Sequence, residues 1–233
     1  MIPVWLLFLT AASLPEQSIG IVIDRAIMDP TVAYLVLDTR SGVVIAARWQ
    51  DTDRAIPVGS LVKPFTALAY AQTEVFATPE RLEEAISHSS NSYFHELAKK
   101  VEPGSLAVVC RRLGLPLPSS PDGLTGLGKS WQIAPLDLAR AYVQLLREPC
   151  ARPILAGMRQ AAQSGTAKAI GGGALAKTGT AECSHVPREA GDGFAIALFP
   201  AESPRYTVLV RKNGTTGANA AVVAGQIRKL VLP

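Results

Sequence analysis

Hydrophobic positions near the start of the chain predict a pair of strands joined by a turn. Residues 31–38 form an almost continuous apolar run, residues 39–42 have the composition of a turn, and residues 43–47 form a second apolar run. Short β-branched runs bounded by Gly, Asp and Ser are typical of hairpin strands. Because both runs contain few polar residues, we expect both faces of this hairpin to be covered.

The middle of the chain has helical spacing instead. Apolar residues recur at intervals of three and four positions over 94–101 and 138–145, which is the pattern of one buried helix face. Thr78-Pro79-Glu80 has the composition of a helix start, because proline is tolerated in the first turn. Residues 103–104 read as a turn before a short helix at about 105–113, which Gly114 would end.

Strand character returns near the C-terminus. Residues 194–199 and 206–210 are apolar and separated by a proline-bounded connection, and a last helix carries Val223, Ile227 and Leu230 on one face. This order predicts an α+β fold, in which helices pack on a mainly antiparallel sheet. We expect a single domain over 13–233, with a helical subdomain at about 60–169 inserted between strands.

Composition narrows the function. Hydrophobic residues make up 48% of the 233 positions, so a packed core is expected rather than disorder. The net charge is +4 but the basic residues are scattered, which argues against a nucleic-acid partner. Residues 1–12 are apolar and too short to cross a bilayer, so they predict a secretory signal peptide and export to the periplasm or cell envelope. No Lys or Arg precedes that run, and a buried N-terminal element is the alternative.

Neither cysteine nor histidine predicts a metal site or a cofactor. The three cysteines, Cys110, Cys150 and Cys183, cannot all pair within the chain, although one disulfide stays open for an exported protein. The histidines are dispersed along the sequence, so clustered metal ligands are missing. We therefore expect no metal and no cofactor.

A serine and a lysine three positions apart form the first candidate catalytic motif, Ser60-Leu61-Val62-Lys63. Pro64 places a helix start close to Ser60, and residues three apart share a helix face. The Lys63 amine can then reach the Ser60 hydroxyl and act as its base. A lysine does this only if burial or a neighbouring cation such as Lys177 lowers its pKa.

Two further motifs complete a candidate site. In Ser89-Ser90-Asn91, the Ser89 hydroxyl could relay a proton and the Asn91 amide could hold Lys63 and a substrate amide; a helix cap is the simpler interpretation. In Lys177-Thr178-Gly179-Thr180, Lys177 and Thr178 could hold a carboxylate, and Gly179 would let a substrate backbone approach. The N–H groups of Thr180 and Ser60 could form an oxyanion hole. An ordinary strand with a solvated lysine is the alternative.

The order of the three motifs resembles that of penicillin-binding proteins and class A β-lactamases. The match to penicillin-binding transpeptidases is wider, since it also includes 58–66, a helical segment at 132–142, Gly165-Thr166-Ala167 and 177–181. The resemblance implies a five-stranded antiparallel sheet with the third motif on an edge strand. Only 26 positions separate Lys63 from Ser89, which implies a reduced helical subdomain.

The resemblance also implies the reaction. Ser60 would attack the penultimate D-Ala carbonyl of a D-Ala-D-Ala peptidoglycan stem peptide, and the acyl group would pass to an amine or to water. A β-lactam would mimic that peptide and acylate Ser60. A β-lactamase of the same fold is one alternative, although the chain has no Glu-x-x-Leu-Asn or Tyr-Gly-Asn segment. A β-lactam sensor or cell-wall-binding scaffold is another, and an envelope protein partner is an open expectation.

Overall fold

The computed structural model describes residues 16–182 and 191–232. The predicted signal peptide at 1–12 lies outside these ranges, as do Cys183 and His185. Within the described part of the chain, no helix has the length and apolarity needed to span a membrane.

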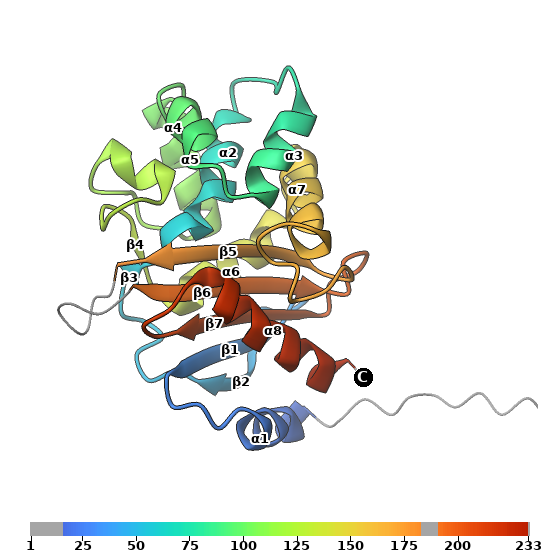
Figure 1. Ribbon diagram of the computed structural model, residues 1–233. Helices are drawn as coiled ribbons and strands as arrows, with labels where there is room; N and C mark the ends of the chain where they lie inside the picture. The colour runs from blue at the N-terminus through green and yellow to red at the C-terminus, as the bar shows by residue number, and fades with distance from the viewer. Residues whose placement is uncertain (1–15, 183–190, 233) are drawn as a thin grey trace, which may run out of the picture.

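One five-stranded antiparallel sheet organises the domain, with the strand order β2-β1-β7-β6-β5 (Figure 1). The predicted α+β fold is therefore confirmed, and β5, which carries the third motif, lies at an edge as the resemblance implied. The strands are β1 (Val32–Asp38), β2 (Val44–Arg48), β5 (Leu175–Ala181), β6 (Asp192–Phe199) and β7 (Tyr206–Lys212).

Both faces of the sheet are packed. Successive side chains of a strand point to opposite sides, and in β1 they enter two different hydrophobic cores. In β1, Tyr34 and Val36 join a core that includes α1 (Glu16–Ala26) and α8 (Gly217–Val231). Leu35 and Leu37 join a second core on the other face, together with α6 (Pro135–Leu145). Figure 1 shows α8 lying across one face of the sheet and α6 behind it. The sheet is thus the middle layer of the molecule.

The remaining helices stand beyond the β5 edge, above it in Figure 1. From β3 to β5 the chain forms three short 3-10 turns and a two-stranded sheet in addition to its α-helices. These elements are β3 (Ile56–Pro57), η1 (Gly59–Val62), α2 (Lys63–Tyr70), α3 (Pro79–Ser87), α4 (Asn91–Ala98), α5 (Pro103–Leu113), η2 (Pro121–Thr125), β4 (Gln132–Ile133), η3 (Pro149–Ala151) and α7 (Arg152–Gln163).

Several local predictions need correction. The turn expected at 103–104 is wrong, because Pro103 is the first residue of α5, where proline is well tolerated. The helix expected over 94–101 ends at Ala98. The hairpin is confirmed, but β2 is an edge strand and stays partly exposed. Of the segment 132–142, only 135–142 is helical, since β4 pairs with β3 instead.

Candidate functional site

The first motif lies at a junction between two helical types. Ser60 belongs to the 3-10 turn η1, and the Lys63 N–H donates a hydrogen bond to the Ser60 carbonyl as α2 begins. Side chains three apart eclipse one another in a 3-10 turn, so Lys63 follows Ser60 on the same side. Pro64 sits in the first turn of α2, as expected from its position. Ser60 is half-buried, while Gly59, Leu61 and Val62 are buried.

A buried tyrosine holds this junction against the helical region. The Tyr142 hydroxyl donates to the Leu61 carbonyl at 2.7 Å, and its ring packs edge-on against Phe65 with centroids 5.0 Å apart. Burial raises the pKa of Tyr142 well above its usual value, so the hydroxyl remains a donor. Pairing of β3 with β4 fixes the chain just before Ser60. The nucleophile segment is therefore anchored on both sides.

The loop that contains Gly126 lies in close contact with the backbone of Ser60. Gly126, which follows η2, has φ +72°, and a Cβ there would lie 2.8 Å from the Cα of Ser60. Real Cβ atoms do not approach this closely, so a side chain at 126 would push the serine backbone aside. Gly126 thus sets the backbone position of Ser60.

Replacing Gly126 with alanine tests this contact, with Gly42→Ala as the matched control. Gly42 has φ +70°, but nothing lies within 4 Å of its Cβ position. Both variants should lose about 1 kcal/mol of stability from the left-handed backbone. Only Gly126→Ala should also slow acylation, by about 10- to 100-fold, because small displacements of a nucleophile are costly. Equal acylation rates in the two variants would contradict this role of Gly126.

The Lys63 amine is buried and held by the second motif. Its side chain is 0% exposed, and Nζ donates to the Ser89 carbonyl at 2.8 Å and to Asn91 Oδ1 at 2.6 Å. Ser89 Oγ lies 3.4 Å away. Burial lowers the pKa of Lys63 to about 8. Loss of hydration on burial, one of the two causes expected from the sequence, produces this shift.

Ser89 lies in the turn between α3 and α4 with a left-handed backbone, φ +55°. Non-glycine residues rarely adopt this conformation, and they do so mainly where function or packing requires it. Its hydroxyl lies 2.8 Å from Lys177 Nζ as well as near Lys63 Nζ. Ser90, not Ser89, caps α4 by accepting from the Tyr93 N–H. The two interpretations of this motif thus fall on different serines.

Lys177 on β5 is also fully buried, and its Nζ donates to the Thr178 carbonyl at 2.7 Å in addition to Ser89 Oγ. Burial lowers the pKa of Lys177 well below its usual value, and the nearby charge of Lys63 lowers it further. Two buried amines therefore meet at one hydroxyl, and both cannot easily be charged. The sequence alternative of a solvated lysine on an ordinary strand is wrong.

The glycine of the third motif serves a different purpose from the one expected. A Cβ on Gly179 would lie 2.8 Å from the Val58 carbonyl oxygen and 3.2 Å from the Leu61 nitrogen. The space next to Gly179 is therefore filled by the nucleophile segment itself, not left for a substrate backbone. The missing side chain lets η1 dock on β5, and this contact places Ser60 beside Thr180.

Thr178 and Thr180 are both engaged in hydrogen bonds. Thr180 Oγ1 accepts from the Gly217 N–H at the start of α8 at 3.0 Å. Thr178 Oγ1 donates to Thr166 Oγ1 at 2.7 Å, and the Thr166 hydroxyl and N–H both donate to the Ser87 carbonyl. Thr166 thus ties β5 to the end of α3, immediately before the Ser89 turn.

Sequence reasoning did not assign roles to Thr166, Tyr142 or Gly126. Thr166 and Tyr142 belong to segments that carry the family resemblance, and Tyr142 also occupies an apolar position of a predicted helix. Gly126 belongs to the segment Gly126-Leu127-Gly128, whose two glycines signal a turn. That signal marks an unusual backbone but not what the backbone touches.

Other conspicuous residues make none of the hydrogen bonds described above. Trp131 is a core residue whose indole donates to the Pro116 carbonyl. Asp51 and Asp53 are exposed on a loop, and His88 and His95 are exposed as well. Cys110 is buried and Cys150 exposed, and each is a free thiol. The described residues contain no group of His, Cys, Asp and Glu able to hold a metal ion.

The chain is similar to known proteins in its three-dimensional structure. No protein-family model matches this sequence, and no curated protein does. The fold is similar to the transpeptidase domain of FtsI4, a D,D-transpeptidase from Legionella pneumophila, with a TM-score of 0.76 and 20% identity. That alignment covers 94% of this chain and 96% of the other.

Two more solved structures have a similar fold. Penicillin-binding protein A from M. tuberculosis, solved as a ceftriaxone acyl-enzyme complex, aligns with a TM-score of 0.69 and 17% identity over 86% of this chain and 74% of that one. PBP2 from Helicobacter pylori, solved in complex with MreC, aligns with a TM-score of 0.76 and 14% identity over 91% and 62%. The chain therefore has the fold of penicillin-binding-protein transpeptidase domains.

Proposed function

We propose that this protein is an exported serine acyltransferase that acts on D-Ala-D-Ala stem peptides of peptidoglycan, with Ser60 as the nucleophile. The observation that carries the proposal is the convergence of Lys63 and Lys177 on the Ser89 hydroxyl, next to the turn that bears Ser60. Structures of the same fold include D,D-transpeptidases and a β-lactam acyl-enzyme. The periplasm or cell envelope is the proposed location, because the substrate is found there.

In the proposed mechanism, the neutral Lys63 amine takes the proton of Ser60 as Oγ bonds to the penultimate D-Ala carbonyl carbon. The oxyanion that forms would accept from the N–H groups of Ser60 and Thr180, whose segments are in contact through Gly59. The C–N bond then breaks. The proton passes from Lys63 through the Ser89 hydroxyl to the departing D-Ala amine. An amine or water then attacks the acyl-enzyme and regenerates Ser60.

The third motif would bind the terminal carboxylate of the substrate. Lys177 is fully buried with its Nζ on Ser89 Oγ, so it acts mainly as a nearby charge. The Thr180 hydroxyl accepts from the Gly217 N–H and keeps its own proton, so it is the candidate for direct contact, whereas Thr178 already donates its proton to Thr166 Oγ1. A bound carboxylate favours the charged form of a neighbouring amine. Substrate binding would therefore raise the pKa of Lys177 and keep Lys63 in its neutral, basic form.

The pH dependence of acylation tests whether Lys63 is the base. Only the neutral form of Lys63 accepts a proton, and its pKa is about 8. At pH 7 about one tenth of the free enzyme is competent, and the acylation rate should rise about tenfold per pH unit up to about pH 8 and level off above it. Stopped-flow fluorescence with a penicillin measures this profile. A flat profile between pH 6 and 9 would show that another group is the base.

Labelling and turnover separate this proposal from its alternatives. A fluorescent penicillin should label the protein stably, and a synthetic peptide ending in D-Ala-D-Ala should release free D-Ala while its D-Ala-L-Ala counterpart does not. Rapid loss of the label would indicate a β-lactamase. Stable labelling without D-Ala release would favour a sensor. Neither labelling nor release would favour a cell-wall-binding scaffold.

A further inference from the structure

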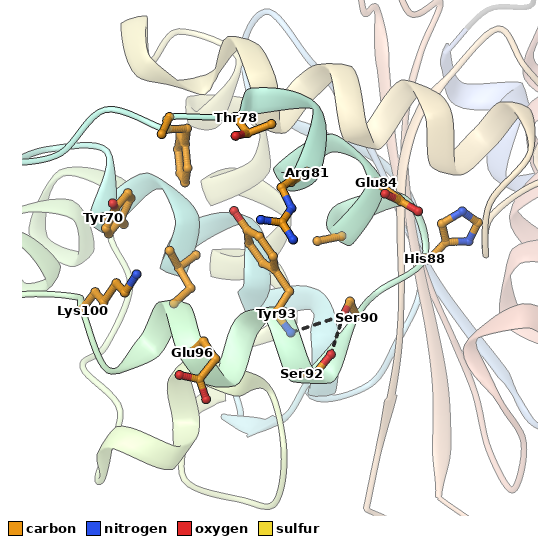
Figure 2. A pocket seen from close by; sticks show the side chains of 14 residues that line it. Tyr70, Thr78, Arg81, Glu84, His88, Ser90, Ser92, Tyr93, Glu96 and Lys100 are labelled. Atoms are coloured by element: carbon orange, nitrogen blue, oxygen red, sulfur yellow. Dashed lines mark hydrogen bonds between the residues drawn. The ribbon is translucent and has the colours of Figure 1, made fainter.

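A groove opens on the helical region behind the Ser89 turn (Figure 2). It has a volume of about 810 Å³, and side chains from α3 and α4, the end of α2 and the connection at 71–78 line it. We refer to it as the α3–α4 groove. Its size is in the range of sites that hold a small ligand or a few residues of peptide.

The turn between α3 and α4 has two sides. Ser89 and Asn91 contact the Lys63 amine, whereas Ser90 and Ser92 line the groove and hydrogen-bond to each other. Figure 2 shows Ser90 and Ser92 at one end of the groove, at the start of α4. A molecule bound in the groove would therefore lie against the back of the turn that holds the proposed catalytic base.

The rest of the groove combines aromatic walls with two cations, Arg81 and Lys100. The rings of Tyr70 and Phe76 pack at a tilt with centroids 5.0 Å apart, and Tyr93 lines the same groove. In Figure 2 Arg81 lies next to the Tyr93 ring, on the side away from Tyr70. Neither Arg81 nor Lys100 forms a salt bridge within the described residues, although the charge of Lys100 helps to lower the pKa of Glu96. An unpaired cation next to aromatic surface suits a carboxylate attached to an apolar group.

The acidic residues of the groove argue against a polyanion as its ligand. Glu96 is paired with Lys99 at 2.7 Å, and Glu84 lies on the same helix as Arg81, at the opposite end of the groove from Lys100 (Figure 2). A nucleic acid or an anionic lipid surface would meet these carboxylates and be repelled. A peptide that carries one or two carboxylates next to a large apolar side chain would not.

We propose that the α3–α4 groove binds an acidic segment of a partner protein, in which Asp or Glu alternates with an aromatic or aliphatic residue. One carboxylate pairs with Arg81 and a second with Lys100, and the apolar side chain packs on Tyr70, Phe76 and Tyr93. Binding favours one conformation of the Ser90–Ser92 turn and so holds Ser89 in its strained position beside Lys63. The effect on acylation depends on the proposed function, but the binding itself does not.

A titration followed by 1H-15N NMR tests the binding. The probe is acetyl-Glu-Phe-Glu-Leu-amide, and its control is acetyl-Gln-Phe-Gln-Leu-amide. We expect the acidic peptide to shift amide signals of α3 and α4, and we expect Arg81→Gln to weaken binding about tenfold while Arg140→Gln, an exposed arginine on α6, has no effect. Equal binding of both peptides, unchanged binding by Arg81→Gln, or no shifts in α3 and α4 would overturn the proposal.

The proposed effect of peptide binding on the Ser89 turn is tested by a separate measurement. Acylation by a fluorescent penicillin is measured with and without a saturating concentration of the acidic peptide. We expect a rate increase of about 5-fold in the natural protein and none in Arg81→Gln. An unchanged rate with the peptide bound would refute the coupling. Absence of labelling under every condition would instead refute the proposed function and leave the peptide-binding result intact.

Discussion

Ser60→Ala is expected to abolish covalent labelling by a fluorescent penicillin. Ser60 carries the only hydroxyl of the η1 turn, since Gly59, Leu61 and Val62 are apolar. Removing a covalent nucleophile lowers the rate of acyl transfer by more than about 10⁴-fold. The Ser60 side chain is half-buried and small, so the variant should keep its fold.

The matched control is Ser203→Ala, on the exposed connection between β6 and β7. It removes the same atom far from the cluster and should label like the natural protein. Thermal unfolding of both variants establishes that they are folded. Labelling of Ser60→Ala at the natural rate would mean that another residue is acylated.

Lys63→Met should have the second largest effect. Methionine matches the length and apolar stem of lysine but cannot accept a proton, so acylation should slow by about 10²- to 10⁴-fold. The free energy of unfolding should change by less than about 2 kcal/mol, because the lost hydrogen bonds to Ser89 and Asn91 are offset by removal of a buried amine. The residual activity should also lose its rise towards pH 8.

Lys168→Met is the control for this variant, because Lys168 is exposed and lies outside the site. It should leave both the rate and the pH profile unchanged. If Lys63→Met unfolded the protein, the loss of activity would say nothing of the base; Lys63→Arg then provides the second test. Arginine keeps a buried cation but stays protonated, so it should fail in acylation as well.

Much of this architecture could be predicted because the relevant signals are local. The strands at 194–199 and 206–210 are bounded by prolines, and the helix over 138–145 has a clear apolar face; all three are present in β6, β7 and α6. The three motifs can also be recognised in the sequence, because each consists of three or four consecutive residues. Their order along the chain resembled a known family, and this resemblance supplied the edge position of β5.

The contacts that make the site were not predictable in the same way. Gly179 was expected to face a substrate, yet the Val58 carbonyl fills that space, and only the packing of η1 on β5 reveals it. The bond from Tyr142 to Leu61 joins segments that are 81 residues apart, and the bond from Thr178 to Thr166 joins β5 to a loop outside the sheet. The degree of burial that lowers the pKa of Lys63 likewise depends on the whole fold.

The most direct test of the central claim is the mass of the intact protein after incubation with benzylpenicillin, followed by peptide mapping. Because a β-lactam opens without losing atoms when it acylates a serine, the account predicts a gain equal to the full mass of the antibiotic. The map should place the added mass on Ser60 and on no other residue. An unmodified protein, or an adduct on any other side chain, would contradict the account.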